Sequence, residues 1–311
     1  MKLGIVLTLF AVFLTSCTPT VRNTLLSKNS NVELVKKGAF GFSEEEERFI
    51  EQEARTFNIN IPDRQEIMRF VNYFLASRQE FERMMQRANY YMPVIKPILK
   101  KHNLPEELAL LPAIESGFNP FAVSRAGAAG LWQFIPSTGR RYGLRIDQDV
   151  DERFDVIKST EAAALYLKDL YEMFKSWELA LAAYNCGENC IIRRTGGMDF
   201  WLTQGFLPAE TRNYVPAFFA VLLLARYPEK YGLSLNVQGL NLKAEKLEEE
   251  TTVEKVTKRV NVRESVFRDL NPHIRGDRIP PGIHIYIPKD RLVFSEEGFI
   301  RLENGAKLII R

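Results

Sequence analysis

The sequence has few of the residues from which metal sites and nucleophilic sites are commonly built. Among 311 residues there are only three cysteines and three histidines, and no four of them have the spacing of a structural zinc site. The 42 lysines and arginines nearly balance the 39 aspartates and glutamates, so the formal charge of +3 gives no argument for nucleic-acid binding. Eighteen glycines and 15 prolines without a repeat exclude a collagen-like chain. The sequence therefore predicts no metal, no cofactor and no nucleic-acid partner.

Long hydrophobic runs are also lacking, because the two apolar runs present both fall short of the ~20 residues that a membrane-spanning helix needs. The first, residues 3–14, follows Lys2 and precedes the small residues before Cys17, an arrangement typical of an export signal. The second, residues 216–225, is closely flanked by charged residues and favours a buried core helix. With 46% hydrophobic residues, the rest of the chain is expected to fold into globular domains.

The Leu-Thr-Ser-Cys sequence at 14–17 resembles the lipobox of bacterial lipoproteins, in which the signal is cut before the cysteine and the thiol is acylated. The resemblance implies that Cys17 becomes a lipid-bearing N-terminus, and each buried CH₂ of an acyl chain contributes ~0.8 kcal/mol to membrane binding. Thr18, rather than an aspartate, follows the cysteine. In bacteria with two membranes this implies sorting to the outer membrane. We therefore expect a cell-envelope protein, anchored to the lipid bilayer through Cys17 at the periplasmic face of the outer membrane.

The texture of the sequence changes along the chain. Apolar residues at helical spacing dominate from residue 43 to residue 232, and no strand pattern precedes residue 230. Beyond it, short β-prone stretches surround a possible helix at 262–270, and Asn304-Gly305 between apolar stretches predicts a C-terminal hairpin. The predicted fold class is mainly α, with a small α/β C-terminal domain. The expected segments are a signal peptide at 1–16, a tether at 17–42, a helical lead-in at 43–95, a helical body at 96–232, a linker at 233–252 and a module at 253–311.

One carboxylate interrupts the apolar face of a helix predicted at 104–116. The buried face is marked by Leu104, Leu108 and Leu111. The next position in this spacing is Glu115. Burial raises the pKa of a carboxyl group, and a raised pKa keeps a general acid protonated near neutral pH. Pro112 should kink this helix and Gly117 should end it, which would leave Glu115 beside a cleft. The alternative is a glutamate at a frayed helix end that reaches solvent or an arginine.

Four motifs then occur in order over about a hundred residues: Glu-Ser at 115–116, Gly-Leu-Trp-Gln at 130–133, Ala-Tyr-Asn at 183–185 and Glu-Thr-Arg-Asn-Tyr at 210–214. Together they resemble the soluble-lytic-transglycosylase domain of bacterial murein-cleaving enzymes, whose helical fold is related to goose-type lysozyme. The closest resemblance is to the membrane-bound lytic murein transglycosylase D group. It implies a lysozyme-like catalytic domain that acts on peptidoglycan glycan strands.

The resemblance also implies a role for each motif residue. Glu115 would be catalytic, Ser116 and Tyr214 would support it, and Gln133, Tyr184 and Asn185 would bind substrate. An amide such as that of Gln133 can both donate and accept, as recognition of an N-acetyl group requires. A surface glutamine is the alternative, which the expected exposure of the neighbouring Trp132 and Phe134 disfavours. Tyr184 and Asn185 follow a helix predicted to end at Ala183, where a core tyrosine and a helix cap are the alternatives.

In the lytic reaction, one carboxylate is sufficient. Glu115 would protonate the oxygen that links N-acetylmuramic acid to N-acetylglucosamine and would then deprotonate the muramyl 6-hydroxyl, which closes on C1. Such an internal nucleophile has an effective molarity of ~10⁵–10⁸ M and replaces both water and a second carboxylate. One alternative is a lysozyme-type hydrolase in which Asp147, Asp149 or Asp151 positions a water. Another is a peptidoglycan-binding lipoprotein without catalysis.

Two further features remain open in the sequence. Cys186 and Cys190 stand in a Cys-Gly-Glu-Asn-Cys segment beside Asn185, where either a disulfide or two free thiols would fit an exported protein. Residues 262–288 resemble the second half of a LysM peptidoglycan-binding module, but the opening Gly-Asp-Thr-Leu signature is missing. The C-terminal module is therefore expected either to bind glycan or to act as a structural cap on the catalytic body.

Overall fold

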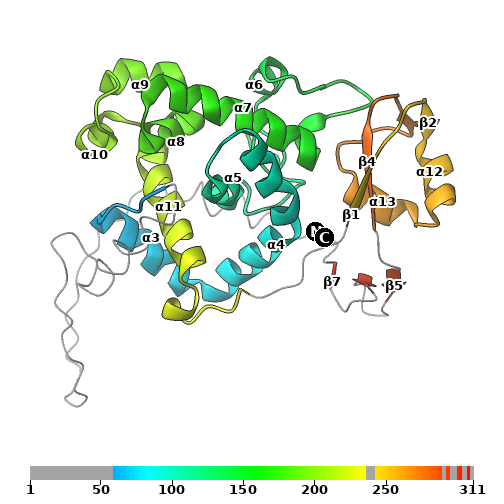
Figure 1. Cartoon of the computed structure of the whole chain (residues 1–311), viewed down its shortest axis with the longest axis horizontal. Coiled ribbons are helices and arrows are strands. Elements are labelled where there is room, and N and C mark those ends of the chain that lie inside the picture. Colours follow the sequence, from blue (N-terminus) through cyan, green and yellow to red (C-terminus); the bar gives the residue numbers. More distant parts are fainter. Residues whose placement is uncertain (1–58, 236–241, 289–291, 295–299, 303–306, 309–311) are drawn as a thin grey trace, which may run out of the picture.

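A computed structural model describes residues 59–235, 242–288, 292–294, 300–302 and 307–308. The described chain is mainly helical, as predicted. In Figure 1, helices from residue 65 to residue 226 gather into one body, and the strands and two short helices of the C-terminal part lie beside it. The predicted signal peptide, tether and lipidated Cys17 lie outside the described residues, as does the first part of the lead-in.

The lead-in contributes two helices that belong to the body. Helix α3 (Gln65–Ala76) packs against α11, and α4 (Arg78–Lys101) packs against α7. Helix α4 runs without a break across the domain boundary expected between residues 95 and 96, although it contains Pro93 and Pro97. Its buried side includes Ile95, Ile98 and Leu99. The lead-in is therefore continuous with the body.

The segment before Glu115 differs in detail from the expected kinked helix. A 3₁₀ helix, η2 (Glu106–Leu110), is followed by a short α-helix, α5 (Leu111–Glu115). Pro112 occupies the first turn of α5, where a missing N–H leaves no hydrogen bond unmade, so it begins a helix instead of kinking one. The three leucines of the predicted face are buried. Gly117 and Phe118, both with φ near +60°, end the helix immediately after Glu115.

The remaining elements of the body surround α11 (Ala209–Arg226), where every residue from Thr211 to Leu224 except Arg212 and Asn213 is buried. The apolar run at 216–225 is thus a core helix, as predicted. Within the described residues, no helix combines the length and the apolar character needed to cross a membrane. The other elements are α6 (Pro136–Arg141), η3 (Glu152–Phe154), α7 (Val156–Phe174), α8 (Trp177–Cys186), α9 (Glu188–Thr195), α10 (Phe200–Thr203), η4 (Gln204–Phe206) and η5 (Glu229–Tyr231).

The single helix expected up to Ala183 is two helices. Lys175 ends α7 in the left-handed conformation, with φ of 52°. Ser176 then caps α8, because its hydroxyl accepts a hydrogen bond from the backbone N–H of Leu179 at 3.3 Å. The short turn lets α8 fold back on α7, and the two helices pack against each other. Tyr184 and Asn185 consequently lie in the last turn of α8 rather than after a helix.

The C-terminal module consists of β1 (Leu242–Lys246), β2 (Thr251–Thr252), α12 (Val253–Val260), α13 (Glu264–Leu270), β3 (Arg278–Ile279) and β4 (His284–Pro288). Strands β1 and β4 pair antiparallel, with Lys243 opposite Ile287, and β2 pairs with β3. The module therefore begins inside the predicted linker, because charged side chains such as Lys243 are tolerated on an edge strand. Its core includes Val256, Phe267 and Ile285, and also Val150 from the body.

A three-stranded sheet of β5 (Leu292–Phe294), β6 (Ile300–Leu302) and β7 (Lys307–Leu308) follows the module. Strands β6 and β7 pair antiparallel, with Ile300 opposite Leu308, as the predicted hairpin requires. The Asn-Gly turn between them lies outside the described residues.

Candidate active site

Glu115 lies at the C-terminal end of α5, where it contacts Tyr214 of α11. The hydroxyl of Tyr214 donates a hydrogen bond to Oε1 of Glu115. Burial of the carboxyl group raises the pKa of Glu115 to about 8, against an opposing effect of the Tyr214 hydrogen bond and with a further rise from the charge of Glu210. The residue as a whole is only partly buried. A proton held at neutral pH is therefore accessible from outside.

Glu210 is a second carboxylate at this site. It lies in the first turn of α11, four residues before Tyr214, so both side chains project from the same face of the helix. Its Oε1 accepts a hydrogen bond from the Asn185 amide at 3.4 Å. The sequence motif includes Glu210, but the sequence analysis assigned it no role. The four-residue spacing from Tyr214 is the signal that could have placed it here.

Ser116 contacts the loop at 122–134 rather than the carboxyl group of its neighbour. Its buried hydroxyl donates to the backbone carbonyl of Leu131 at 2.9 Å. This bond ties the end of α5 to the segment that carries the Gly-Leu-Trp-Gln motif. Ser116 therefore supports the site by holding two backbone segments together.

Gln133 and its neighbours are arranged differently from the expectation. The expected exposure of Trp132 and Phe134 is wrong, because both are buried. The indole N–H of Trp132 finds a partner inside the body, the hydroxyl of Thr160 on α7 at 2.9 Å, which makes complete burial of the ring possible. Gln133 itself is partly exposed, with φ of 50°. Its amide nitrogen donates to the carbonyl of Gly130 at 2.8 Å, which leaves the amide oxygen as the group available to a ligand.

Tyr184 and Asn185, at the end of α8, both belong to the site. The hydroxyl of Tyr184 donates to the backbone carbonyl of Trp132 at 2.9 Å. Burial raises the pKa of Tyr184 well above its ordinary value, and the nearby charge of Glu115 raises it further. Asn185 uses its amide oxygen to accept from the Thr211 hydroxyl at 2.7 Å. Neither residue therefore acts only as the core tyrosine or the helix cap considered above.

The aspartates considered for a hydrolytic mechanism are engaged elsewhere. Asp147 accepts hydrogen bonds from the backbone N–H groups of Asp149 and Val150, each at 2.9 Å. Asp149 forms an ion pair with Arg278 of the C-terminal module at 3.1 Å. Asp151 is fully buried in an ion pair described below. These three carboxylates hold the C-terminal module and do not contact the residues around Glu115.

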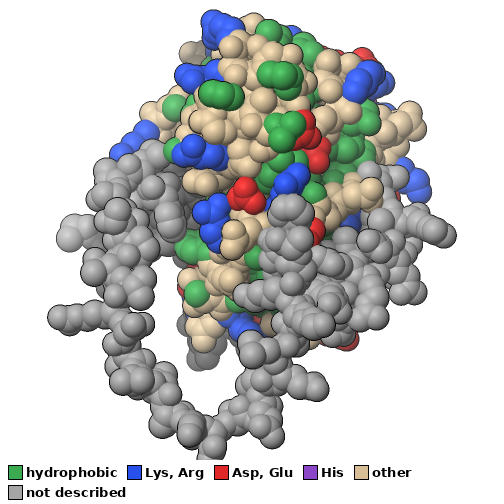
Figure 2. Space-filling model, turned by 90° about the vertical axis from the view of Figure 1, so that its left-hand side faces the viewer, with side chains coloured by type: hydrophobic (Ala, Val, Ile, Leu, Met, Phe, Trp, Pro, Cys, Tyr) green, Lys and Arg blue, Asp and Glu red, His purple; other side chains and the backbone are tan. Residues whose placement is uncertain are grey.

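A disulfide connects Cys186, the last residue of α8, to Cys190 in α9, with 5.9 Å between their Cα atoms. It closes the turn that follows Asn185. Beyond it, Figure 2 shows hydrophobic side chains gathered on the upper part of the face where α9 and α10 lie. The large exposed apolar side chains of this segment are Ile192, Met198, Leu202 and Phe206. The surface next to the disulfide is thus unusually apolar.

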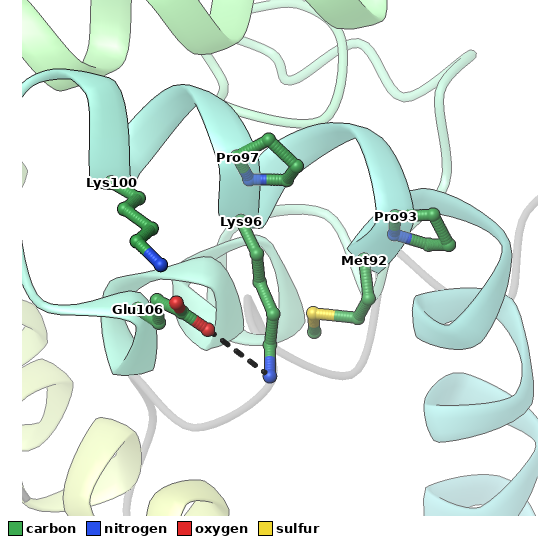
Figure 3. A pocket seen from close by; sticks show the side chains of 6 residues that line it. All are labelled: Met92, Pro93, Lys96, Pro97, Lys100 and Glu106. Atoms are coloured by element: carbon green, nitrogen blue, oxygen red, sulfur yellow. Dashed lines mark ion pairs between the residues drawn. The ribbon is translucent and has the colours of Figure 1, made fainter.

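Two surface cavities lie away from these residues. The larger, of about 500 Å³, lies on α4 between Pro93 and Pro97, and Lys96 and Glu106 form an ion pair of 3.8 Å across it (Figure 3). The other, of about 400 Å³, is lined by Tyr142 and residues of α7. Neither is lined by Glu115 or by the other motif residues. Among the described residues, no three histidine, cysteine, aspartate or glutamate side chains are grouped closely enough to hold a metal ion.

Residues 92–199 match the family model described as the transglycosylase SLT domain. The chain contains a transglycosylase SLT domain. It is 35% identical over 231 residues to the membrane-bound lytic murein transglycosylase D of Escherichia coli K12, covering 71% of this chain and 51% of that protein. It is 30% identical over 122 residues to the membrane-bound lytic murein transglycosylase C of Glaesserella parasuis, covering 34% of this chain and 33% of that protein.

The chain thus spans about half the length of the first of these relatives. A solved structure, the 70 kDa soluble lytic transglycosylase Slt70 of Escherichia coli, matches 54% of this chain and 31% of that one, with 20% identity and a TM-score of 0.40. The soluble lytic transglycosylase Slt of Pseudomonas aeruginosa, as an inactive mutant, matches 46% of this chain and 24% of that one, with 21% identity and a TM-score of 0.38. Identities and overlaps this low add nothing to the fold described above.

Proposed function

We propose that this SLT-domain protein is a peptidoglycan lytic transglycosylase. It cleaves the β-1,4 bond between N-acetylmuramic acid and N-acetylglucosamine and leaves 1,6-anhydro-N-acetylmuramic acid ends. The observation that carries the proposal is the Glu115 carboxyl group, whose pKa burial raises to about 8 and whose Oε1 accepts a hydrogen bond from Tyr214. A carboxylic acid in this state has the protonation that a general acid needs at neutral pH.

The first step is proton transfer from Glu115 to the glycosidic oxygen. Because Tyr214 occupies Oε1, the proton belongs on Oε2, the oxygen left to face the substrate. The bond from the muramyl C1 to this oxygen breaks, the N-acetylglucosamine leaves with the proton as a free hydroxyl, and positive charge develops at C1. The resulting Glu115 carboxylate is stabilised by the Tyr214 hydroxyl, since a hydrogen bond to a charged acceptor is stronger than one to a neutral acceptor.

The second step regenerates the acid. The muramyl 6-hydroxyl attacks C1, and its proton passes to the Glu115 carboxylate, so the enzyme returns to its starting state and no water is consumed. This route needs only one group that both gives and takes a proton. The intramolecular attack replaces the activated water of ordinary glycosidases, with an effective molarity of ~10⁵–10⁸ M.

Gln133, Tyr184 and Asn185 are the proposed substrate-binding residues. The free amide oxygen of Gln133 suits the N–H of an N-acetyl group. Tyr184 holds the loop that presents Gln133, and Asn185 is oriented by Thr211. These side chains come from separate elements, so the substrate would be bound between the 122–134 loop and the end of α8.

A second candidate function has one observation in its favour. Glu210 lies near enough to Glu115 for its charge to raise the pKa of that residue, and two neighbouring carboxylates are what a lysozyme-type hydrolase uses. The names of the similar proteins, both membrane-bound lytic murein transglycosylases, favour the lytic route. Product chemistry distinguishes the two reactions.

The test is mass spectrometry of the fragments that the purified chain releases from sacculi. Anhydro ends, with a mass lower by one water than reducing ends, support the lytic reaction. Reducing ends would instead assign a hydrolase. E115Q keeps the size and the hydrogen bonds of the side chain but carries no transferable proton, so it should release no fragments. Its sedimentation with sacculi should stay near that of the wild type, which separates loss of chemistry from loss of binding.

We also infer that Cys17 carries the lipid anchor and that the protein faces the periplasm from the outer membrane. The sequence at 14–17 supports this inference, and the similar proteins are named membrane-bound. Radiolabelled palmitate should enter the wild-type protein and not C17A, and the labelled protein should fractionate with the outer membrane. The C-terminal module keeps its proposed LysM-like assignment, for which its strand, helix, helix, strand order from β1 to β4 is the structural support.

A further inference from the structure

The C-terminal module is joined to the body at residues 147–151, directly before the helices that carry part of the site. Val150 of the body pairs as an isolated antiparallel bridge with Ile274 of the module, and its side chain is fully buried in the core of the module. The backbone N–H of Asp151 donates to the carbonyl of His273 at 2.9 Å. The backbone N–H of Arg275 donates to Asp149 at 3.0 Å. The module therefore adds a short pairing segment to the body.

At this junction, one buried carboxylate is held by two arginines. Asp151 is fully buried and pairs with Arg153, whose Nε and Nη2 donate to the two carboxylate oxygens at 2.9 and 2.8 Å. From the module, the guanidinium of Arg275 donates to Oδ2 of Asp151 and, at 3.2 Å, to the carbonyl of Asp147. The Arg153 side chain is 8% exposed and that of Arg275 is 42% exposed. The additional positive charge thus lies on the side that water reaches.

Arg153 in turn supports the loop of the proposed site. Its Nη1 donates to the carbonyl of Gly127 at 2.6 Å and to that of Phe134 at 3.1 Å, at the two ends of the segment that contains Gln133. The loop also packs against the Arg153 backbone, because a Cβ added at Gly130 would meet the Arg153 carbonyl oxygen at 1.9 Å. The orientation of one guanidinium therefore sets the position of this loop.

We propose that Arg275 of the C-terminal module is a positioning residue for Gln133, acting through Asp151 and Arg153. The inference rests on the proposed function, in which Gln133 binds substrate. Asp151 fixes the Arg153 guanidinium on one side, and Arg275 fixes Asp151 on the other, so the three side chains form a continuous chain of charge-assisted hydrogen bonds from the module to the loop. Without Arg275, the buried carboxylate keeps one partner and gains freedom to rotate with it.

The chain offers a matched control. Arg278 belongs to the same module and contacts the same body segment, through Asp149, but it does not contact Asp151 or Arg153. R278A therefore removes a comparable module-to-body ion pair without touching the chain that leads to Gln133. R275K keeps the charge beside Asp151 but loses the planar fork that donates to two acceptors at once.

The test measures initial rates of fragment release from sacculi with the full chain, together with hydrogen exchange of the loop amides. R275A should raise KM about tenfold, as expected for a lost charged hydrogen bond, and leave kcat within about twofold. The amides of Ala129 and Gly130, which donate to Phe134 and Ala122 within the loop, should exchange faster in R275A. R278A should change neither quantity, and R275K should fall between the wild type and R275A.

Each other outcome overturns the inference. Unchanged KM means that the loop does not depend on Arg275 for its function. A raised KM with unchanged exchange means that Arg275 contacts substrate directly. If circular dichroism shows R275A to be unfolded, R275K and R278A decide, and equal KM values in these two variants contradict the proposal. If the wild-type chain releases nothing from sacculi, the proposed function fails, and equal loop exchange in R275A and R278A would then refute the positioning role on its own.

Discussion

Replacing Glu115 by glutamine should make the folded protein more stable at alkaline pH while removing its activity. An ordinary glutamate ionises near pH 4.5, whereas burial raises the pKa of Glu115 in the folded protein to about 8. Between these values, the folded state holds one proton that the unfolded state has released. Stability therefore decreases as pH rises, by about 1.4 kcal/mol per pH unit for one full proton.

Summed from about pH 5 to about pH 8, where ionisation is incomplete at both ends, this amounts to about 3 kcal/mol lost by the wild type and not by E115Q. The measurement is urea-induced unfolding of both proteins across this range. Glu172→Gln provides a control, because Glu172 is exposed on α7 and its replacement should leave the wild-type pH dependence intact. Parallel stability curves for the wild type and E115Q would mean that Glu115 titrates like a solvated carboxyl group, and the proposed general acid would lose its physical basis.

Three further predictions concern the surroundings of Glu115. Tyr214→Phe removes a donor that lowers the pKa of Glu115, so the alkaline limb of the pH–rate profile should move to higher pH, and kcat should fall about 10- to 100-fold as the carboxylate loses a partner; a limb that moves to lower pH contradicts this. Glu210→Gln removes a negative charge that raises the same pKa, so the limb should move to lower pH, and an unmoved limb would show that Glu210 does not act on Glu115. Gly130→Ala places a methyl group 1.9 Å from a backbone oxygen at φ of +78° and should cost about 3 kcal/mol in the free energy of unfolding, whereas Gly127→Ala, with the same φ and open space, should cost about 1 kcal/mol; equal losses in urea unfolding refute the steric assignment.

The helical class, the buried character of 216–225 and the position of Glu115 on an apolar face were all predictable from the sequence, because each depends on local spacing. Apolar residues three and four apart identify the buried side of a helix whatever it packs against. The same spacing breaks down where two elements share one pattern. The run up to Ala183 is helical throughout, but Lys175 in the left-handed conformation divides it into α7 and α8, and no local signal marked that turn.

The site residues that motif order identified were also brought together, with Tyr214 and Asn185 meeting Glu115 and Glu210 from α11 and α8. Exposure was less predictable. Trp132 stands in a polar, glycine-rich stretch, yet it is buried because Thr160, 28 residues later, offers its indole a hydrogen-bond acceptor. A partner so distant along the chain leaves no trace in the sequence around the tryptophan.

The sequence alone determined which residue carries the proton and which segments are helical, since periodicity and motif order are properties of neighbouring residues. Tertiary structure alone decided that the carboxyl group of Glu115 meets a phenol and a second carboxylate, and that Arg275 of the C-terminal module reaches Asp151 across 124 positions of the chain. Desolvation and ion pairing depend on what surrounds a group in space, and the folded chain supplies those surroundings from residues that the sequence keeps far apart.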